Sequence, residues 1–331
     1  MERQQLIHTW LEKILPDSPF TLAPASADAS FRCYFRASFA DGSTRIVMDA
    51  PPSHEDCRPY LHVAELFHAA GAHVPEVFAH DLEQGFLLLS DLGSTTYLAA
   101  LTPDNANDLY ADALGALAAI QQASRPGQLP EYDRALLLRE MMLFPEWYVA
   151  RHKGVTLTDA EMAELLSVFE SIMAVNLAEP QVFVHRDYHC RNLMLSHPNP
   201  GVLDFQDAVY GPITYDLASL FKDAYIHWEE EQTLDWLVRY WEIGRQIGLP
   251  VRADFNDFHR DYEFMGAQRH IKVLGIFARL YHRDGKDGYL KDMPLVMHYL
   301  RSACARYGEL RPLLRLLDRL EPEGVQIGYT F

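Results

Sequence analysis

The sequence predicts an α+β protein of two lobes, a small β-sheet lobe followed by a large, mainly helical lobe. The chain has 331 residues, and at about 150 residues per domain this length favours two domains. Strand-like segments and turn residues fill the first ninety positions, whereas helical periodicity dominates from Pro103 onward. We expect the boundary at residues 90–93 (SDLG), which divides the chain into 1–92 and 93–331.

The first lobe is expected to be a small sheet with one inserted helix. Asp41-Gly42 separates two strand-like runs, and an Asp-Gly pair in that position is a strong hairpin signal. Gly71 stops an amphipathic helix, and a turn at 83–85 separates two further strands. The expected elements are a helix at the N-terminus, strands at 31–39 and 43–48, a helix at 60–70, and strands at 77–80 and 86–89.

The second lobe is expected to be helical apart from a strand-rich island at 182–205. Apolar residues recur at helical spacing in each of the other segments. The expected helices are 104–122, 136–152, 158–177, 216–225, 229–248, 254–282 and 295–320.

Composition and net charge indicate a globular protein that does not bind nucleic acid. Hydrophobic residues make up 49% and charged residues 23% of the chain, which is typical of globular proteins. The net charge of −17 argues against a nucleic-acid partner. The four cysteines form no CxxC pair, which predicts reduced thiols. The charged N-terminal segment is unlike a signal peptide, and no apolar run approaches the ~20 residues that span a bilayer. We therefore expect a soluble, cytoplasmic protein with no membrane partner; the oligomeric state is left open.

The most informative stretch is 184–195 (VHRDYHCRNLML), followed by 202–205 (VLDF). Phosphoryl transfer needs a carboxylate that orients the attacking hydroxyl and oxygen ligands for Mg²⁺ beside the phosphates. Asp187 fits the first need, and Asn192 and Asp204 fit the second. A single Asp or Asn in a turn commonly caps or shapes that turn, but the three together at these spacings favour a catalytic site.

Hairpin geometry supports this interpretation. The segment 197–201 (HPNPG) is rich in turn residues and separates two short strands. A turn centred near residue 198 places Asn192 and Asp204 roughly opposite each other, with Cβ atoms about 5 Å apart. Asp204 also lies between two apolar residues, where a charge is costly unless it is paired or binds a metal.

The pattern H-x-D-x-x-x-x-N followed by a strand with an aspartate resembles the aminoglycoside phosphotransferase branch of the protein-kinase-like fold. This resemblance implies a nucleotide-binding lobe at 1–92, a catalytic and substrate-binding lobe at 93–331, and ATP as the donor. It further implies that Asp187 is the catalytic base and that Asn192 and Asp204 are Mg²⁺ ligands. Asp216 has the local sequence of a helix N-cap, and the resemblance implies that it tethers the catalytic loop.

Shorter phrases resemble one subfamily, the kinases of cell-wall recycling that phosphorylate the anomeric C1 hydroxyl of N-acetylmuramate and N-acetylglucosamine. This resemblance implies a sugar 1-kinase of peptidoglycan recycling with a small-molecule sugar as its substrate. Two alternatives stay open: a kinase of an aminoglycoside, choline or homoserine, and a non-catalytic ATP-binding protein. The phrases are 28–32 (DASFR), 48–52 (MDAPP), 203–208 (LDFQDA), 272–280 (KVLGIFARL) and 283–286 (RDGK).

The sequence departs from the kinase pattern at the nucleotide site. No G-x-G-x-x-G loop precedes the hairpin, and the segment 26–32 occupies its place. Met48 stands where the family has its phosphate-binding lysine, so we take Arg32 as the candidate phosphate-binding cation, with a solvated surface arginine as the alternative. The resemblance also implies that backbone groups of Ser90 and Leu92 contact the adenine edge, beneath an apolar ceiling formed by Ile46.

For the acceptor, Lys272, Arg279 and Arg283 share one face of the predicted helix 254–282. They predict either a cationic stripe for the lactyl carboxylate of muramic acid or an ordinary solvated face. Four tryptophans of this lobe are candidates for stacking on a sugar, although aromatic residues at helical spacing are more often part of a core. These are Trp147, Trp228, Trp236 and Trp241.

Overall fold

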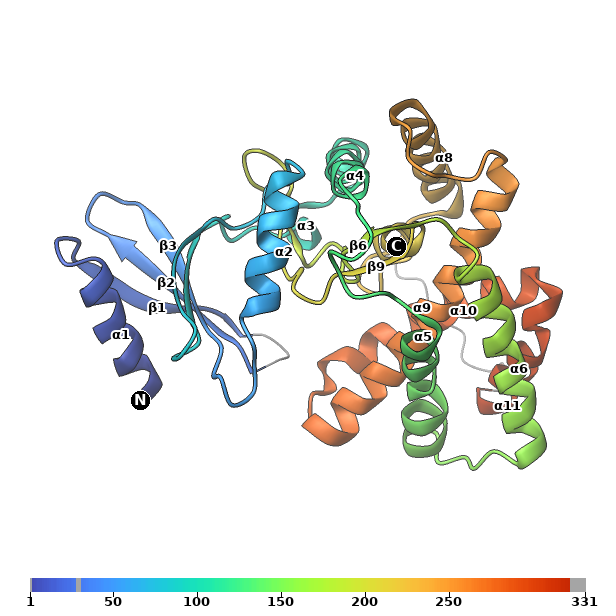
Figure 1. Ribbon diagram of the computed structural model, residues 1–331. Helices are drawn as coiled ribbons and strands as arrows, with labels where there is room; N and C mark the ends of the chain where they lie inside the picture. Colours follow the sequence, from blue (N-terminus) through green and yellow to red (C-terminus); the bar gives the residue numbers. More distant parts are fainter. Residues whose placement is uncertain (1, 28–30, 322–331) are drawn as a thin grey trace. The chain divides into compact units, whose positions relative to one another are not determined.

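The protein is represented by a computed structural model that describes residues 2–27 and 31–321 (Figure 1). The chain forms two compact units: a first unit of residues up to 120 together with 191–208, and a second unit of 121–190 together with 209 onward. A sheet dominates one unit and helices dominate the other, which confirms the predicted α+β class. The lobe boundary expected at residue 92 stays a prediction.

The first unit contains a five-stranded sheet in the order β1-β2-β3-β5-β4, in which neighbouring strands are antiparallel. Its elements in chain order are α1 (Glu2–Ile14), β1 (Phe20–Ala27), β2 (Cys33–Phe39), β3 (Thr44–Asp49), α2 (Arg58–Ala69), β4 (Val77–Asp81), β5 (Phe86–Ser90), α3 (Tyr97–Ala100), α4 (Ala106–Gln122, which ends in the second unit), β7 (Leu193–Met194) and β8 (Gly201–Val202).

The predicted elements of this sheet are confirmed. β2 and β3 form the expected hairpin around Gly42, which has φ +84°, a value that favours glycine. Apolar residues of α1, Ile7 and Leu11 among them, are buried against Val47 of β3 and Leu88 of β5. Figure 1 shows α1 and α2 on opposite sides of the sheet.

Strand β1 was not predicted. Its sequence, FTLAPASA, contains Pro24 and lacks the alternation of apolar and polar residues that marks a half-buried strand. It joins the sheet by pairing with β2, and the register shifts between Pro24 and Ser26. The pairing partner, not the local pattern, therefore makes this segment a strand.

The second unit is mainly helical. Its elements in chain order are α5 (Arg134–Met141), the π-helix η1 (Phe144–His152), α6 (Asp159–Asn176), β6 (Gln181–Val184), β9 (Val209–Pro212), α7 (Tyr215–Phe221), α8 (Glu230–Ile247), α9 (Phe255–Asp284), the 3₁₀ helix η2 (Asp287–Asp292), α10 (Met293–Arg306), the 3₁₀ helix η3 (Gly308–Leu310) and α11 (Arg311–Leu320).

Three of the predicted helices are longer than the helices in the structure. The segment expected at 136–152 is two elements, because Pro145 at the start of η1 cannot donate a helical hydrogen bond. The segment expected at 295–320 is interrupted by η3, and the helix expected to reach residue 225 ends at Phe221. Periodicity located these segments correctly and missed only where they break.

Helix α9 is the longest element and lies at the centre of the second unit (Figure 1). A Cβ at Gly275 would lie 2.5 Å from the carbonyl carbon of Leu143, so the glycine lets α9 approach the chain just before η1. Several polar residues of α9 are fully buried, which is costly unless they are paired. Within residues 2–27 and 31–321, no helix is long and apolar enough to cross a membrane.

Candidate active site

A cavity of about 370 Å³ lies within the first unit. Strand residues, the segment that follows β5 and the β7–β8 hairpin line it. Ile46, Ser90, Leu92, Asn192 and Asp204 all line this one cavity. The structure thus brings together five of the residues singled out from the sequence, in a space of the size that small-molecule ligands occupy.

The segment after β5 is fixed by an ion pair that sequence reasoning missed. Arg36 Nε donates to Asp91 Oδ2 at 2.6 Å, and the Gly93 N–H donates to Asp91 Oδ1 at 2.9 Å. Although burial alone would raise the pKa of Asp91, the hydrogen bond from Arg36 holds it below its ordinary value. The N–H of Ser90 donates to the carbonyl of Glu76 at 2.9 Å, so this N–H is already engaged within the protein.

The β7–β8 hairpin places Asn192 next to Asp204, but not by the expected register. Leu193 pairs with Val202, so Asn192 stands opposite Leu203, one residue away from the predicted partner. Asp204 has φ +63°, a left-handed conformation uncommon for a non-glycine residue. In this conformation the Asn192 Nδ2 lies 3.4 Å from Asp204 Oδ2. The pairing of the two side chains was predicted correctly, and the symmetric register was wrong.

The nucleotide-site cation was expected to be Arg32, since Met48 replaces the usual lysine. Met48 is buried in β3. The Arg32 side chain is largely buried, with Nε 3.3 Å from Glu55 Oε2 and Nη1 3.7 Å from Asp204 Oδ1. Burial opposes its charge, but Tyr34, Glu55 and Asp204 raise the pKa of Arg32 above its ordinary value. The alternative of a solvated surface arginine is therefore wrong, whereas phosphate binding stays a prediction. Residues 28–30 of the predicted phosphate-facing loop lie outside the described residues.

The predicted catalytic loop follows β6 in the second unit. The buried carboxylate of Asp216 accepts hydrogen bonds from the N–H groups of His185 at 2.7 Å and Arg186 at 3.0 Å. Arg186 has φ +76°, so these bonds hold the backbone in a strained turn just before Asp187. The tether expected for Asp216 is confirmed. Its interpretation as an N-cap is wrong, because Thr214 occupies that position of α7.

Asp187 lies among cationic side chains of its own unit. Burial alone would raise its pKa, but Lys272, His189, Arg269 and Arg186 hold the pKa of Asp187 below the ordinary value of an aspartate. The carboxylate is therefore ionised throughout the neutral range and is able to accept a hydrogen bond from a hydroxyl. This charge state fits a residue that orients an acceptor hydroxyl.

The predicted cationic stripe on α9 does not exist as a unit. Lys272 is buried, lies 3.2 Å from Glu140 Oε1 and donates to the Tyr215 hydroxyl at 3.0 Å. Arg283 is exposed and pairs with its neighbour Asp284 at 2.7 Å. Shared helical spacing placed these residues on one side of the helix, but the packing of the unit gave them different surroundings.

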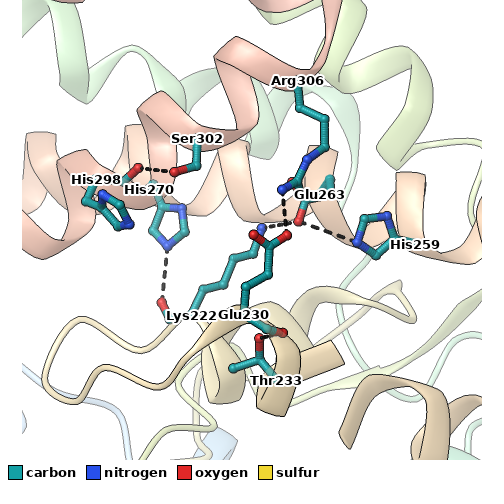
Figure 2. A network of polar contacts seen from close by, with 9 residues as sticks. All are labelled: Lys222, Glu230, Thr233, His259, Glu263, His270, His298, Ser302 and Arg306. Atoms are coloured by element: carbon teal, nitrogen blue, oxygen red, sulfur yellow. Dashed lines mark hydrogen bonds and ion pairs between the residues drawn. The ribbon is translucent and has the colours of Figure 1, made fainter. Parts of the chain in front are cut away.

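A second cavity, of about 380 Å³, lies within the second unit and was not predicted. Its polar side centres on Glu263, which pairs with Lys222 at 2.5 Å and with Arg306 at 3.1 Å, and has His259 at 3.9 Å (Figure 2). Burial alone would raise the pKa of Glu263, but Lys222 holds it below the ordinary value.

Apolar side chains also line the second cavity, among them Trp228, Leu234 and Leu237. Among the four tryptophans considered from the sequence, Trp228 is half-buried and lines this cavity, whereas Trp236 belongs to the core. A lining that combines an aromatic side chain with polar groups is suited to a sugar, which has apolar ring faces and a rim of hydroxyls.

Comparison with known proteins places the chain in a family. The model of the phosphotransferase enzyme family (APH) matches residues 21–255. N-acetylmuramate/N-acetylglucosamine kinases of Neisseria meningitidis and Pseudomonas aeruginosa are 49% and 51% identical to this chain, covering 100% and 98% of it and the same shares of their own lengths. A solved choline kinase structure from Streptococcus pneumoniae has a TM-score of 0.64 at 13% identity, covering 91% of this chain and 100% of that one. This likeness confirms the predicted kinase-like fold. The chain belongs to the phosphotransferase enzyme family.

Proposed function

We propose that this protein is an ATP- and Mg²⁺-dependent kinase of N-acetylmuramate and N-acetylglucosamine. The observation that carries the proposal is similarity of about 50% over full length to two kinases of that name. The predicted activity as an amino-sugar kinase agrees with these relatives. Phosphorylation at the C1 hydroxyl and a place in peptidoglycan recycling remain predictions.

The proposed roles follow the geometry of each unit. Asp187 orients the acceptor hydroxyl and accepts its proton as the bond to the phosphoryl group forms. Ile46, Ser90 and Leu92 contact the adenine, because they line the cavity of the first unit. Arg32, beside Asp204, is proposed to contact the phosphates.

Asn192 and Asp204 are proposed to hold Mg²⁺. The side chains lie side by side and offer amide and carboxylate oxygens, a hard donor set that suits Mg²⁺. Mg²⁺ is bound in proteins through one or two such side chains together with substrate phosphates. When bound, the ion would neutralise charge on the phosphates of ATP.

The second cavity is proposed to receive the acceptor sugar. It belongs to the same unit as Asp187, and its lining of Trp228 together with polar side chains fits a sugar ring. Lys222, which lines it, is followed by Asp223, whose carboxylate accepts the N–H of Cys190 in the catalytic loop at 3.0 Å. The cavity and the loop are therefore joined through adjacent residues. A cytoplasmic location is proposed as well, because the reaction consumes ATP.

The test is release of ADP from ATP and Mg²⁺ with N-acetylmuramate, N-acetylglucosamine, kanamycin, choline or no acceptor, and with both sugars reduced at C1 to the alditols. We expect turnover with the two free sugars and none with the alditols. Turnover with the alditols would contradict the C1 hydroxyl as the acceptor. Turnover with kanamycin or choline alone would contradict the sugar kinase and keep the phosphotransferase.

A further inference from the structure

Lys272 of α9 carries a positive charge in the interior of the second unit. The residue is 7% exposed; its Nζ lies 3.2 Å from Glu140 Oε1 and donates to the Tyr215 hydroxyl at 3.0 Å. Burial alone would lower the pKa of Lys272, but Glu140 raises it above the ordinary value, so the amine is charged throughout the neutral range. A buried ion pair is often no more stable than apolar side chains of similar size. Stability alone therefore does not explain why a lysine stands here.

Glu140 joins Lys272 to the catalytic loop. The Oε1 atom of Glu140 that faces Lys272 also accepts a hydrogen bond from Arg186, the residue directly before Asp187. Its Oε2 atom accepts from the hydroxyl of Tyr132, which is neutral because burial raises the pKa of that phenol well above its ordinary value. Glu140, Arg186 and Lys272 form what we call the Glu140 cluster. Two cations on one carboxylate leave this cluster with one positive charge in excess.

The excess charge lies where it acts on Asp187. Burial alone would raise the pKa of Asp187, and Lys272 makes the largest contribution in the opposite direction. The charged and titratable side chains that act on Asp187 are Lys272 and Arg269 of α9, Arg186 and His189 of the catalytic loop, and Asp216 of α7. Lys272 lines neither of the two cavities described above, so its place in the unit suits an effect on Asp187 and not a contact with a substrate.

We propose that Lys272 is a positioning residue of the reaction, because its positive charge keeps Asp187 in the carboxylate form that accepts the proton of the acceptor hydroxyl. The inference rests on the proposed function. The proton passes to Asp187 while the hydroxyl oxygen bonds to the γ-phosphorus of ATP and the bond from that phosphorus to ADP breaks. Glu140 makes the buried lysine tolerable and sets the excess charge of the cluster at one.

The experiment measures kcat from pH 4 to 9 with N-acetylglucosamine, which has no carboxylate of its own to titrate. Lys272→Met leaves no excess charge in the Glu140 cluster. The pH at which kcat falls to half on the acid side should therefore rise by about 1–3 units, the effect of removing an opposite charge from beside an aspartate. Lys272→Gln makes the same change of charge with a polar side chain and should give the same shift. KM for ATP and for the sugar should stay within about twofold, because Lys272 contacts neither.

A double variant separates charge from packing. Glu140→Gln/Lys272→Met leaves Arg186 as one positive charge, the same excess as in the wild type, so the half-point should return to within about half a unit of the wild-type value. If Lys272 served only the packing of the unit, the two substitutions would add their losses instead. The matched control is Arg260→Met on the same helix, which removes one positive charge from a side chain that is 41% exposed and pairs with Glu309 at 3.1 Å; its profile should equal that of the wild type.

Three results would overturn the inference: an unchanged half-point in both Lys272 variants, a loss of kcat that is the same at every pH, or a double variant worse than either single variant. Failure of both Lys272 variants to fold, seen by circular dichroism, would likewise assign Lys272 a structural role. A wild type inactive on both amino sugars would instead contradict the proposed function.

Discussion

The two units hold their key carboxylates in opposite ways. Asp204 of the first unit ends a short hairpin at the edge of a cavity, and its side chain is 35% exposed. Asp187 of the second unit lies among buried cations that hold its pKa down. The difference matches the proposed roles. A carboxylate that holds Mg²⁺ must be open to the ion and to phosphates, whereas a carboxylate that orients a hydroxyl must stay ionised beside it.

The two sites also share a feature. Arg186, directly before Asp187, and Asp204 both have positive φ, and they are the non-glycine residues with this conformation in the described ranges. Such a conformation costs of order 1–3 kcal/mol and persists only where the surrounding structure enforces it. Strain thus coincides with both proposed parts of the reaction, and in the second unit Asp216 enforces it.

The largest effect is expected from a substitution of Asp187, the carboxylate of the second unit. Asp187→Asn should lower kcat about 10²- to 10⁴-fold with either sugar, because the amide cannot accept the hydroxyl proton. ATP affinity, measured by isothermal titration calorimetry, should stay within about twofold. Because the pKa of Asp187 is lowered, the wild-type kcat should show no loss attributable to this residue between pH 8 and 5. Loss of ATP binding together with kcat would mean that Asp187 is structural.

The next prediction concerns Asp216, whose carboxylate holds the backbone of the catalytic loop before Asp187. Burial raises the pKa of Asp216 to about 7, above the unfolded value of about 3.9. The folded state therefore holds this proton more tightly than the unfolded state does. The contribution of Asp216 to the free energy of unfolding is greatest at low pH and falls as pH rises from about 4 to 7, by up to about 1.4 kcal/mol per pH unit. Asp216→Asn should remove this contribution. Urea unfolding of both proteins at pH 5, 6, 7 and 8 measures the difference, and a difference independent of pH would contradict a raised pKa.

A smaller effect is expected from Asp204, the partly exposed carboxylate of the first unit. Asp204→Asn removes one anionic oxygen ligand, so the Mg²⁺ concentration for half-maximal rate should rise about tenfold. Asp56→Asn, an exposed change in the same unit, is the matched control and should leave it unchanged. If both variants need the same Mg²⁺ concentration as the wild type, Asp204 is not a ligand.

The smallest effect is expected from single substitutions in the linings of the two cavities, which should change KM for different substrates. Trp228→Ala removes the aromatic wall of the second cavity, which should raise KM for both sugars about fivefold and leave KM for ATP unchanged. Ile46→Ala in the first cavity should raise KM for ATP and leave KM for both sugars unchanged. Steady-state kinetics with each substrate varied in turn measures both. A rise in KM for ATP in Trp228→Ala would refute the assignment of this cavity to the acceptor.

Most of the local structure follows from the sequence, because helical periodicity and turn residues act over a few positions. The β2–β3 hairpin, the stop of α2 before Gly71 and the motif around Asp187 were all identifiable in this way. Strand β1 and the π-helix η1 were not. The first depends on a pairing partner and the second on where a proline interrupts a helix.

The sequence by itself determined the family and which carboxylates to consider, since motif spacing needs no knowledge of packing. Only the tertiary structure decided how those side chains are surrounded. It shifted the Asn192–Asp204 register by one residue and paired Lys272 with Glu140. The physical reason is that burial and charge pairing depend on residues far apart in the chain, such as Glu140 and Lys272, which no local pattern connects.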